Sequence, residues 1–157
     1  MAIDVSVDIE KTFEVQCDRE KVVELLADVP RSVSHFPKVE QLVDLGGDSY
    51  RWEMEKIGAG KYFFQTVYAC NYTSNVEEGW VKWTSVSGVG NAQVQGSWDV
   101  RNKGNMTSIT LRNNGVFTMP FPRLAKSLVS PLVKRELESL LDTYTKNLIE
   151  TFTGLGS

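Results

Sequence analysis

The sequence predicts an α+β fold in which a curved antiparallel sheet of about seven strands wraps around one long C-terminal helix. Three observations support this. The chain has 157 residues, the size of one domain with one hydrophobic core. Apolar and polar residues alternate over residues 3–15 and again between 39 and 119, as in strands with one buried face. After residue 122 the apolar period becomes that of a helix.

The composition is that of a globular protein. Hydrophobic residues make up 41% and charged residues 24% of the chain, and the formal net charge is −3. We therefore expect a single domain over residues 1–157. Nucleic-acid binding is disfavoured because it depends on clustered lysine and arginine. Since no segment approaches the ~20 apolar residues of a membrane helix, and the N-terminus lacks a secretory pattern, we expect a cytoplasmic protein that does not span a membrane.

The first part of the chain predicts one strand followed by two short helices. Ile3–Val15 has apolar residues at nearly every second position, which indicates a half-buried strand. Asp18 is a suitable N-cap for a helix, and Pro30 disfavours its simple continuation. A second short helical turn is expected to stop at Pro37.

The middle of the chain, from Val39 to Met119, predicts about six further strands joined as hairpins. Turn residues such as Gly46-Gly47-Asp48 and Gly88-Val89-Gly90 separate the apolar stretches. Within the strands every second residue is apolar, and the clearest examples are Tyr50, Trp52, Met54, Val81, Trp83, Val94, Trp98, Val100, Ile109 and Leu111. Each of these strands is therefore expected to have one dry and one wet face.

The C-terminal part predicts a long amphipathic helix. Its expected apolar face consists of Leu124, Leu128, Leu132, Leu137, Leu140, Leu141, Tyr144, Leu148 and Phe152. Pro131 leaves two alternatives. It could kink one continuous helix, or it could occupy the first position of a second helix whose N-cap is Ser130.

This order of elements resembles the START-like superfamily, also known as the helix-grip fold or the polyketide cyclase/dehydrase and lipid transport (SRPBCC) group. The resemblance covers nearly the whole chain. It rests on packing motifs at residues 22–29 and 35–39, on Trp83-Thr84-Ser85 with Gly88, and on Gly96-Ser97-Trp98. Within the superfamily, the chain is most similar to the coenzyme Q-binding branch and to the branch that resembles the G protein of carbon monoxide dehydrogenase. The resemblance implies a cavity for an apolar ligand between the sheet and the C-terminal helix.

Catalytic signatures are absent from the sequence: there is no P-loop, GxSxG or HExxH motif. His35, the single histidine, stands in a proline-bounded turn and is expected to hydrogen-bond locally. Cys17 and Cys70 lack metal-ligand spacing, so we expect two buried thiols, no metal site and no cofactor. Glu53 and Glu55 alternate with apolar residues and are expected to face water, which argues against a paired-carboxylate mechanism.

We expect large inward side chains to bind the ligand, because tyrosine and tryptophan can line a cavity while offering a polar tip. The candidate ligand-binding residues are Tyr50, Trp52, Met54, Phe64, Tyr68, Trp83, Trp98, Phe117, Met119, Phe121, Leu137, Leu141 and Tyr144. We expect the segment from Phe117 to Phe121, with the first turn of the C-terminal helix, to form an apolar lip at the entrance.

Three functions are compatible with this pattern. The favoured one is binding of a lipid, an isoprenoid quinone or a polyketide-like molecule. The alternative is an aromatase or cyclase that uses the same cavity as a template. The third is an interaction module, with a homodimer or another protein as its partner.

Overall fold

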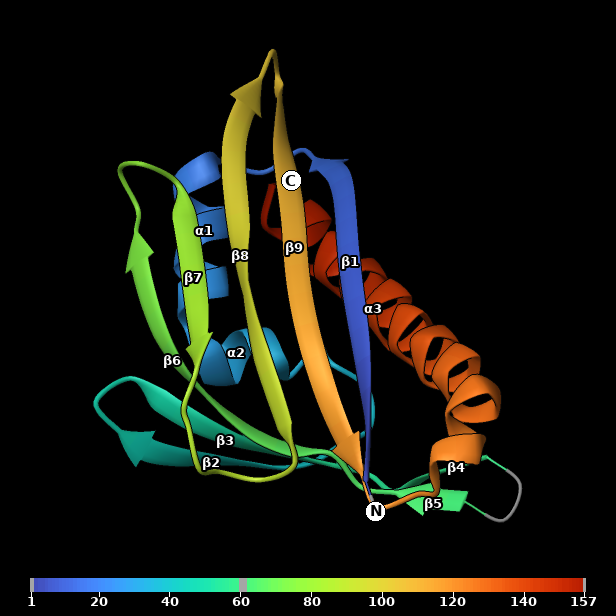
Figure 1. Cartoon of the computed structure of the whole chain (residues 1–157). Helices are drawn as coiled ribbons and strands as arrows, with labels where there is room; N and C mark the ends of the chain where they lie inside the picture. Colours follow the sequence, from blue (N-terminus) through green and yellow to red (C-terminus); the bar gives the residue numbers. More distant parts are fainter. Residues whose placement is uncertain (1, 60–61, 157) are drawn as a thin grey trace.

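The computed structural model describes residues 2–59 and 62–156. Its centre is a seven-stranded antiparallel sheet in the order β1-β9-β8-β7-β6-β3-β2 (Figure 1). The strands of this sheet are β1 (Ile3–Val15), β2 (Val39–Gly46), β3 (Ser49–Met54), β6 (Val67–Asn75), β7 (Trp80–Ser85), β8 (Ala92–Lys103) and β9 (Met106–Met119). The helices are α1 (Arg19–Ala27), α2 (Val29–Val33), the 3-10 turn η1 (Arg123–Ala125) and α3 (Lys126–Gly156).

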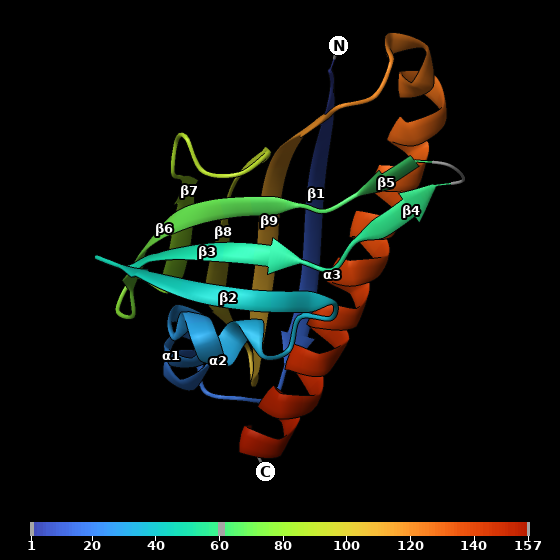
Figure 2. The same cartoon turned by 90° about the horizontal axis from the view of Figure 1, so that it is seen from below.

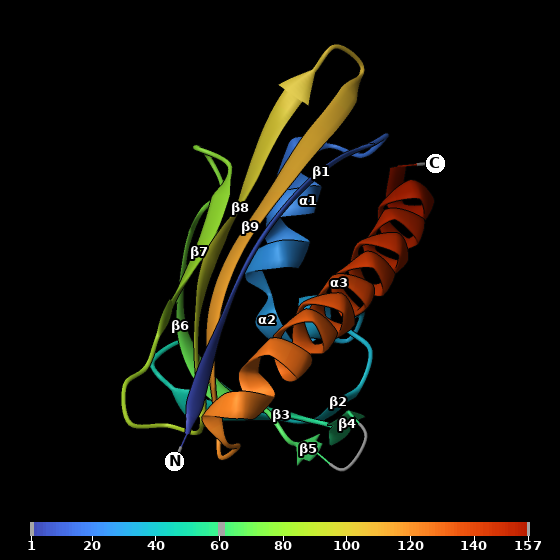
Figure 3. The same ribbon diagram turned by 45° about the vertical axis from the view of Figure 1, so that its right-hand side comes forward.

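The predicted helix-grip architecture is confirmed. All three α-helices lie on one face of the curved sheet, and α3 runs across it (Figure 3). The prediction missed one feature, a separate two-stranded hairpin of β4 (Ile57–Ala59) and β5 (Tyr62–Phe64). Figures 1 and 2 both show this hairpin beside the first half of α3. Strands of three residues are too short to give a reliable two-residue period.

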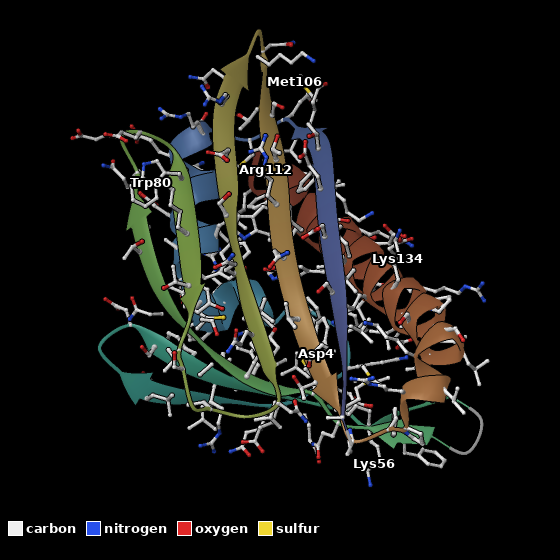
Figure 4. All side chains as sticks on the ribbon, viewed as in Figure 1. Asp4, Lys56, Trp80, Met106, Arg112 and Lys134 are labelled. Atoms are coloured by element: carbon white, nitrogen blue, oxygen red, sulfur yellow. The ribbon has the colours of Figure 1, made fainter. Side chains whose placement is uncertain are left out.

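The first and last strands of the chain are paired with each other. β1 lies antiparallel to β9 along its whole length, from Ile3 opposite Met119 to Val15 opposite Thr107. Alternate residues of β1 are buried, as the sequence period predicts. The other face is polar: Arg112 of β9 lies on the outer face (Figure 4), where its guanidinium approaches Asp99 at 3.0 Å and Glu10 at 3.4 Å.

Asp28 and Pro30 separate the two short helices. Asp28 is the C-cap residue of α1, and its side chain accepts a hydrogen bond from the backbone N–H of Arg31 at the start of α2. Pro30 lies in the first turn of α2, where its missing N–H costs no helical hydrogen bond. α1 buries Val22, Val23, Leu25 and Leu26, and it contacts β6, β7 and β8.

The helix α3 is continuous from Lys126 to Gly156, with Pro131 inside its second turn, so the two-helix alternative does not apply. Its buried residues are Val129, Val133, Leu140, Leu141, Tyr144, Thr145, Leu148 and Phe152. The prediction was wrong for the three leucines at its start: Leu124, Leu128 and Leu132 are 93%, 59% and 37% exposed. Leu128 and Leu132 each precede a buried valine by one residue, a rotation of about 100° around the helix.

None of the described helices is long and apolar enough to cross a membrane.

Candidate functional site: an apolar cavity between sheet and helix

A cavity of about 100 Å³ lies between the sheet and the helices, with walls from α1, α2, β3, β5, β6, β7, β8, β9 and α3. The predicted ligand-binding residues that line it are Trp52, Met54, Phe64, Tyr68, Trp83, Trp98, Phe117, Met119, Leu137, Leu141 and Tyr144. The sequence period placed the strand residues on one side because residues two apart in a strand share a face. The structure thus brings together predicted residues from seven elements.

Two predicted residues lie outside this wall. Tyr50 is half-buried near the start of β3, where its ring meets that of Tyr72 edge-on at a centroid distance of 5.9 Å. Phe121 is buried in the segment between β9 and η1. Both side chains pack against the protein without reaching the cavity.

Sequence reasoning missed a second group of lining residues. Among them are Leu26, Val29, Ser32, Val33, Phe36, Thr66, Cys70, Tyr72, Asn113 and Leu140. For β6 a usable signal existed, because Thr66, Tyr68, Cys70 and Tyr72 are two residues apart and therefore share a face. For the short helix α2 no such signal exists, since five residues cover too little of a helical period to define an apolar side.

Aromatic rings form much of the cavity wall and hold one another in place. The rings of Trp52 and Tyr68 are stacked, with centroids 5.5 Å apart and planes 17° from parallel. Phe36 of the loop after α2 contacts Trp52 at 5.4 Å and Tyr144 at 4.8 Å. Tyr144 in turn meets Trp98 at 5.8 Å. These contacts connect β3, β6, β8 and α3 into a rigid apolar surface.

Most polar tips inside the wall bond to neighbouring protein atoms. Trp52 Nε1 donates a hydrogen bond of 2.9 Å to the hydroxyl of Tyr72, and Trp83 Nε1 donates one of 3.1 Å to Oδ1 of Asn113. The Cys70 thiol donates to a backbone carbonyl at 3.3 Å. These bonds satisfy groups that would otherwise be costly to bury.

The interior of the cavity is uncharged at neutral pH. Burial raises the pKa of the Cys70 thiol to about 12. Burial is also the main reason that the pKa values of Tyr68, Tyr72 and Tyr144 lie above the usual value of a phenol. All four groups therefore keep their protons, so they can donate hydrogen bonds and are poor bases.

The charged residues of the wall lie at one rim. Lys38 and Glu55 are the exposed members of the lining, and Lys38 Nζ lies 2.9 Å from Oε1 of Glu136 on α3. The expectation that Glu55 would face water away from the site is therefore incomplete, because this residue borders the cavity. Lys38 has a positive φ of 60°, and its carbonyl accepts a hydrogen bond of 2.9 Å from the N–H of Glu55.

The predicted apolar lip is wrong. Phe117, Met119 and Phe121 are all buried, because β9 continues through Met119 and pairs with β1 to that point. The exposed apolar side chains near the start of α3 are those of Leu124 and Leu128. The exposed lining residues instead place the contact between cavity and solvent at the Lys38–Glu136 rim.

The expectations for His35 and the cysteines are confirmed. His35 Nε2 lies 2.8 Å from the hydroxyl of Thr151, and Nδ1 lies 3.0 Å from the carbonyl of Arg31. These bonds use both ring nitrogens locally, and the side chain does not line the cavity. Cys17 and Cys70 are buried free thiols. Within residues 2–59 and 62–156, no three histidine, cysteine or carboxylate side chains gather as metal ligands.

A family model described as "Polyketide cyclase / dehydrase and lipid transport" matches residues 6–148. No curated protein matches the sequence. Among solved structures, TTHA0849 from Thermus thermophilus superposes with a TM-score of 0.67 at 17% identity, over 96% of this chain and 99% of that one. A START superfamily protein from Mycobacterium smegmatis also gives a TM-score of 0.67, at 16% identity over 94% and 98% of the two chains.

The Zhui aromatase/cyclase from Streptomyces sp. R1128 gives a TM-score of 0.60 at 14% identity, over 96% of this chain and 93% of that one. Identities this low support a shared fold only. The finer placement in the coenzyme Q-binding and carbon monoxide dehydrogenase-associated branches stays a prediction.

Proposed function

Because the chain belongs to the polyketide cyclase/dehydrase and lipid transport family, within the START-like superfamily, we propose that its cavity binds an apolar small molecule of the lipid, isoprenoid quinone or polyketide class. The observation that carries this proposal is the wall itself. It consists of stacked aromatic rings and aliphatic side chains, and its charged members lie at one rim. Binding then rests on removing apolar ligand surface from water, at about 25 cal/mol per Å².

Binding is better supported than catalysis by proton transfer. A general acid or base works best when its pKa lies near the operating pH. The buried titratable groups of the wall are the Cys70 thiol and the phenols, and burial moves their pKa values upward, away from neutrality. The cavity therefore offers shape and hydrogen-bond donors rather than a base.

The size of the cavity defines what binding requires. Pockets that hold drug-sized ligands typically measure ~300–1,000 Å³, whereas this cavity has about 100 Å³. A compact ligand fits without rearrangement, and a multi-ring ligand requires the walls to separate. We place that movement at the rim, where the ion pair of Lys38 with Glu136 bridges the segment before β2 to α3. We place the protein in the cytoplasm, where the buried thiols Cys17 and Cys70 stay reduced.

The test is binding of a neutral, environment-sensitive dye such as Nile red, followed by mass spectrometry of an organic extract of the purified protein. Leu137→Gln removes apolar surface from the cavity wall, and the matched control Glu138→Gln changes the next residue, which is exposed. We expect Leu137→Gln to weaken dye binding by about 5- to 100-fold, the equivalent of ~1–3 kcal/mol for one buried side chain. The control is expected to change nothing. Equal dye affinities in all three proteins would contradict the proposal.

A further inference from the structure

Three tyrosines line the cavity, and they differ in what their hydroxyls contact. The hydroxyl of Tyr72 accepts a hydrogen bond of 2.9 Å from Trp52 Nε1. The hydroxyl of Tyr144 lies 2.5 Å from Oγ of Ser32. For Tyr68, no hydrogen-bond partner of the hydroxyl exists among the residues that the structure describes, although the residue is only 9% exposed. A buried polar group with an unused hydrogen bond is costly unless something else satisfies it.

The position of this hydroxyl is fixed by the fold. The Tyr68 ring is stacked on Trp52, and the Trp52 indole is itself held by its bond to Tyr72. Tyr68 also belongs to the central strand β6, between β3 and β7. The ring cannot swing to solvent without breaking the stack, so its hydroxyl presents a donor at a fixed point of the cavity wall.

The neighbouring polar groups indicate what kind of partner is missing. Because the oxygen of Tyr72 accepts from Trp52, the hydrogen of that hydroxyl is left to donate elsewhere. Tyr68 therefore shares the wall with a second phenol that offers a donor. Burial raises the pKa values of both phenols, so both stay protonated at neutral pH. The unmet need of this wall is an acceptor.

The charge distribution excludes an anionic acceptor. A carboxylate or phosphate buried in a low-dielectric cavity requires a cation beside it. The cation of the described lining is Lys38, which lies at the rim and is paired with Glu136. A neutral carbonyl oxygen needs no counter-charge and has two lone pairs, enough for one or both phenols.

We propose that Tyr68 donates a hydrogen bond to a neutral carbonyl oxygen, of the ketone, quinone or ester type, in the bound ligand. The inference rests on the proposed function, since it names the chemistry that the same cavity recognises. Apolar area supplies most of the affinity, and Tyr68 selects a ligand that carries an oxygen at one point over a pure hydrocarbon of the same shape.

The test uses acetophenone and α-methylstyrene, two molecules of nearly equal shape in which a carbonyl oxygen is replaced by a CH₂ group. Affinities of both are measured by calorimetry for the wild-type protein, for Tyr68→Phe and for the control Tyr50→Phe. The control removes a phenol hydroxyl from the adjoining strand β3, outside the cavity wall. We expect Tyr68→Phe to weaken acetophenone about 3- to 10-fold and to leave α-methylstyrene within about twofold. Tyr50→Phe is expected to change neither.

Infrared spectroscopy gives a second readout that needs no variant. The carbonyl band of acetophenone bound to the wild-type protein should lie at a lower frequency than in cyclohexane, because a hydrogen bond weakens the C=O bond. Equal effects of Tyr68→Phe on both molecules, or an unshifted band, would overturn the assignment while leaving apolar binding intact. If neither molecule binds the wild-type protein, the proposed function itself fails, and this inference fails with it.

Discussion

The hydroxyl of Tyr144 on α3 lies 2.5 Å from the hydroxyl of Ser32 on α2, so a buried hydrogen bond joins the short helix to the long one. Ser32 is 3% exposed and Tyr144 is 6% exposed. Each hydroxyl has lost its contact with water and depends on the other for a partner. The pair is therefore a sensitive point of the core.

We expect Ser32→Ala and Tyr144→Phe each to lower the free energy of unfolding by about 1–3 kcal/mol, since each leaves one buried hydroxyl unpaired. The double variant should lose less than the sum of the two, because it leaves no orphan. Urea denaturation measures all three values. Thr110→Val is the control: its hydroxyl lies 3.1 Å from that of Thr12 on the exposed face. That substitution should stay within about 0.5 kcal/mol, and strict additivity of the buried pair would contradict the account.

Stability should fall at alkaline pH. The thiol of Cys70 has an ordinary pKa of 9.0, which burial raises to about 12 in the folded protein. Burial shifts the pKa of the Tyr68 phenol in the same direction from 10.0. Below pH 9 both the folded and the unfolded state hold these protons. Between pH 9 and about 12 the unfolded chain releases them first, so the free energy of unfolding decreases as the pH rises.

Urea midpoints at pH 8, 9.5 and 10.5 test this prediction. We expect a progressive decrease, and Cys70→Ala should make the decrease shallower because one of the responsible groups is gone. A midpoint that stays constant across this range would show that burial does not hold these protons.

Gly90 should be intolerant of a side chain. Its φ is +71°, and a Cβ atom there would collide with the carbonyl oxygen of Val67 at the start of β6. That carbonyl also accepts a hydrogen bond from the N–H of Asn91. Gly88 is the matched control, with a φ of +79° and open space around it. In thermal denaturation, Gly88→Ala carries only the backbone strain, and Gly90→Ala should be the more destabilising by at least ~1 kcal/mol. Equal effects would remove the steric argument.

The Lys38–Glu136 ion pair should control access to the cavity more than it controls stability. Both side chains are partly exposed, so Glu136→Gln is expected to change the free energy of unfolding by less than ~1 kcal/mol. The same variant should speed the association of Nile red, measured by stopped flow, at low salt. At ~1 M salt, where screening acts within about 3 Å, wild type and variant should converge. Glu14→Gln, at the distant pair with Lys103, is the control and should leave the rate unchanged.

The strands could be read from the sequence because a sheet with one buried face repeats every two residues. The predicted bounds of β1 agree with the structure at both ends, and the inward aromatic residues of β3, β7 and β8 follow from the same period. The first turns of α3 could not be read in this way. There two apolar rows lie one residue apart, Leu128 and Leu132 beside Val129 and Val133, and the sequence does not distinguish which row faces the sheet.

The cavity residues of α2 and the rim were beyond sequence reasoning for a different reason. Ser32, Phe36 and Lys38 reach the site through the path of a short helix and a loop, and that path depends on tertiary packing. The ion pair of Lys38 with Glu136 joins residues 98 positions apart, a separation that no local pattern encodes.

The pairing of β1 with β9 also has a consequence for the order of events during synthesis. β1 is complete at Val15, but its neighbour in the described sheet ends at Met119. On the ribosome, the first strand therefore emerges long before the strand that will cover its open hydrogen-bonding edge. Such non-local pairings fold slowly and leave an unpaired edge open to other chains. The carboxylates of Asp4, Asp8, Glu10 and Glu14, spread along β1, give the nascent strand a repulsive charge during that interval.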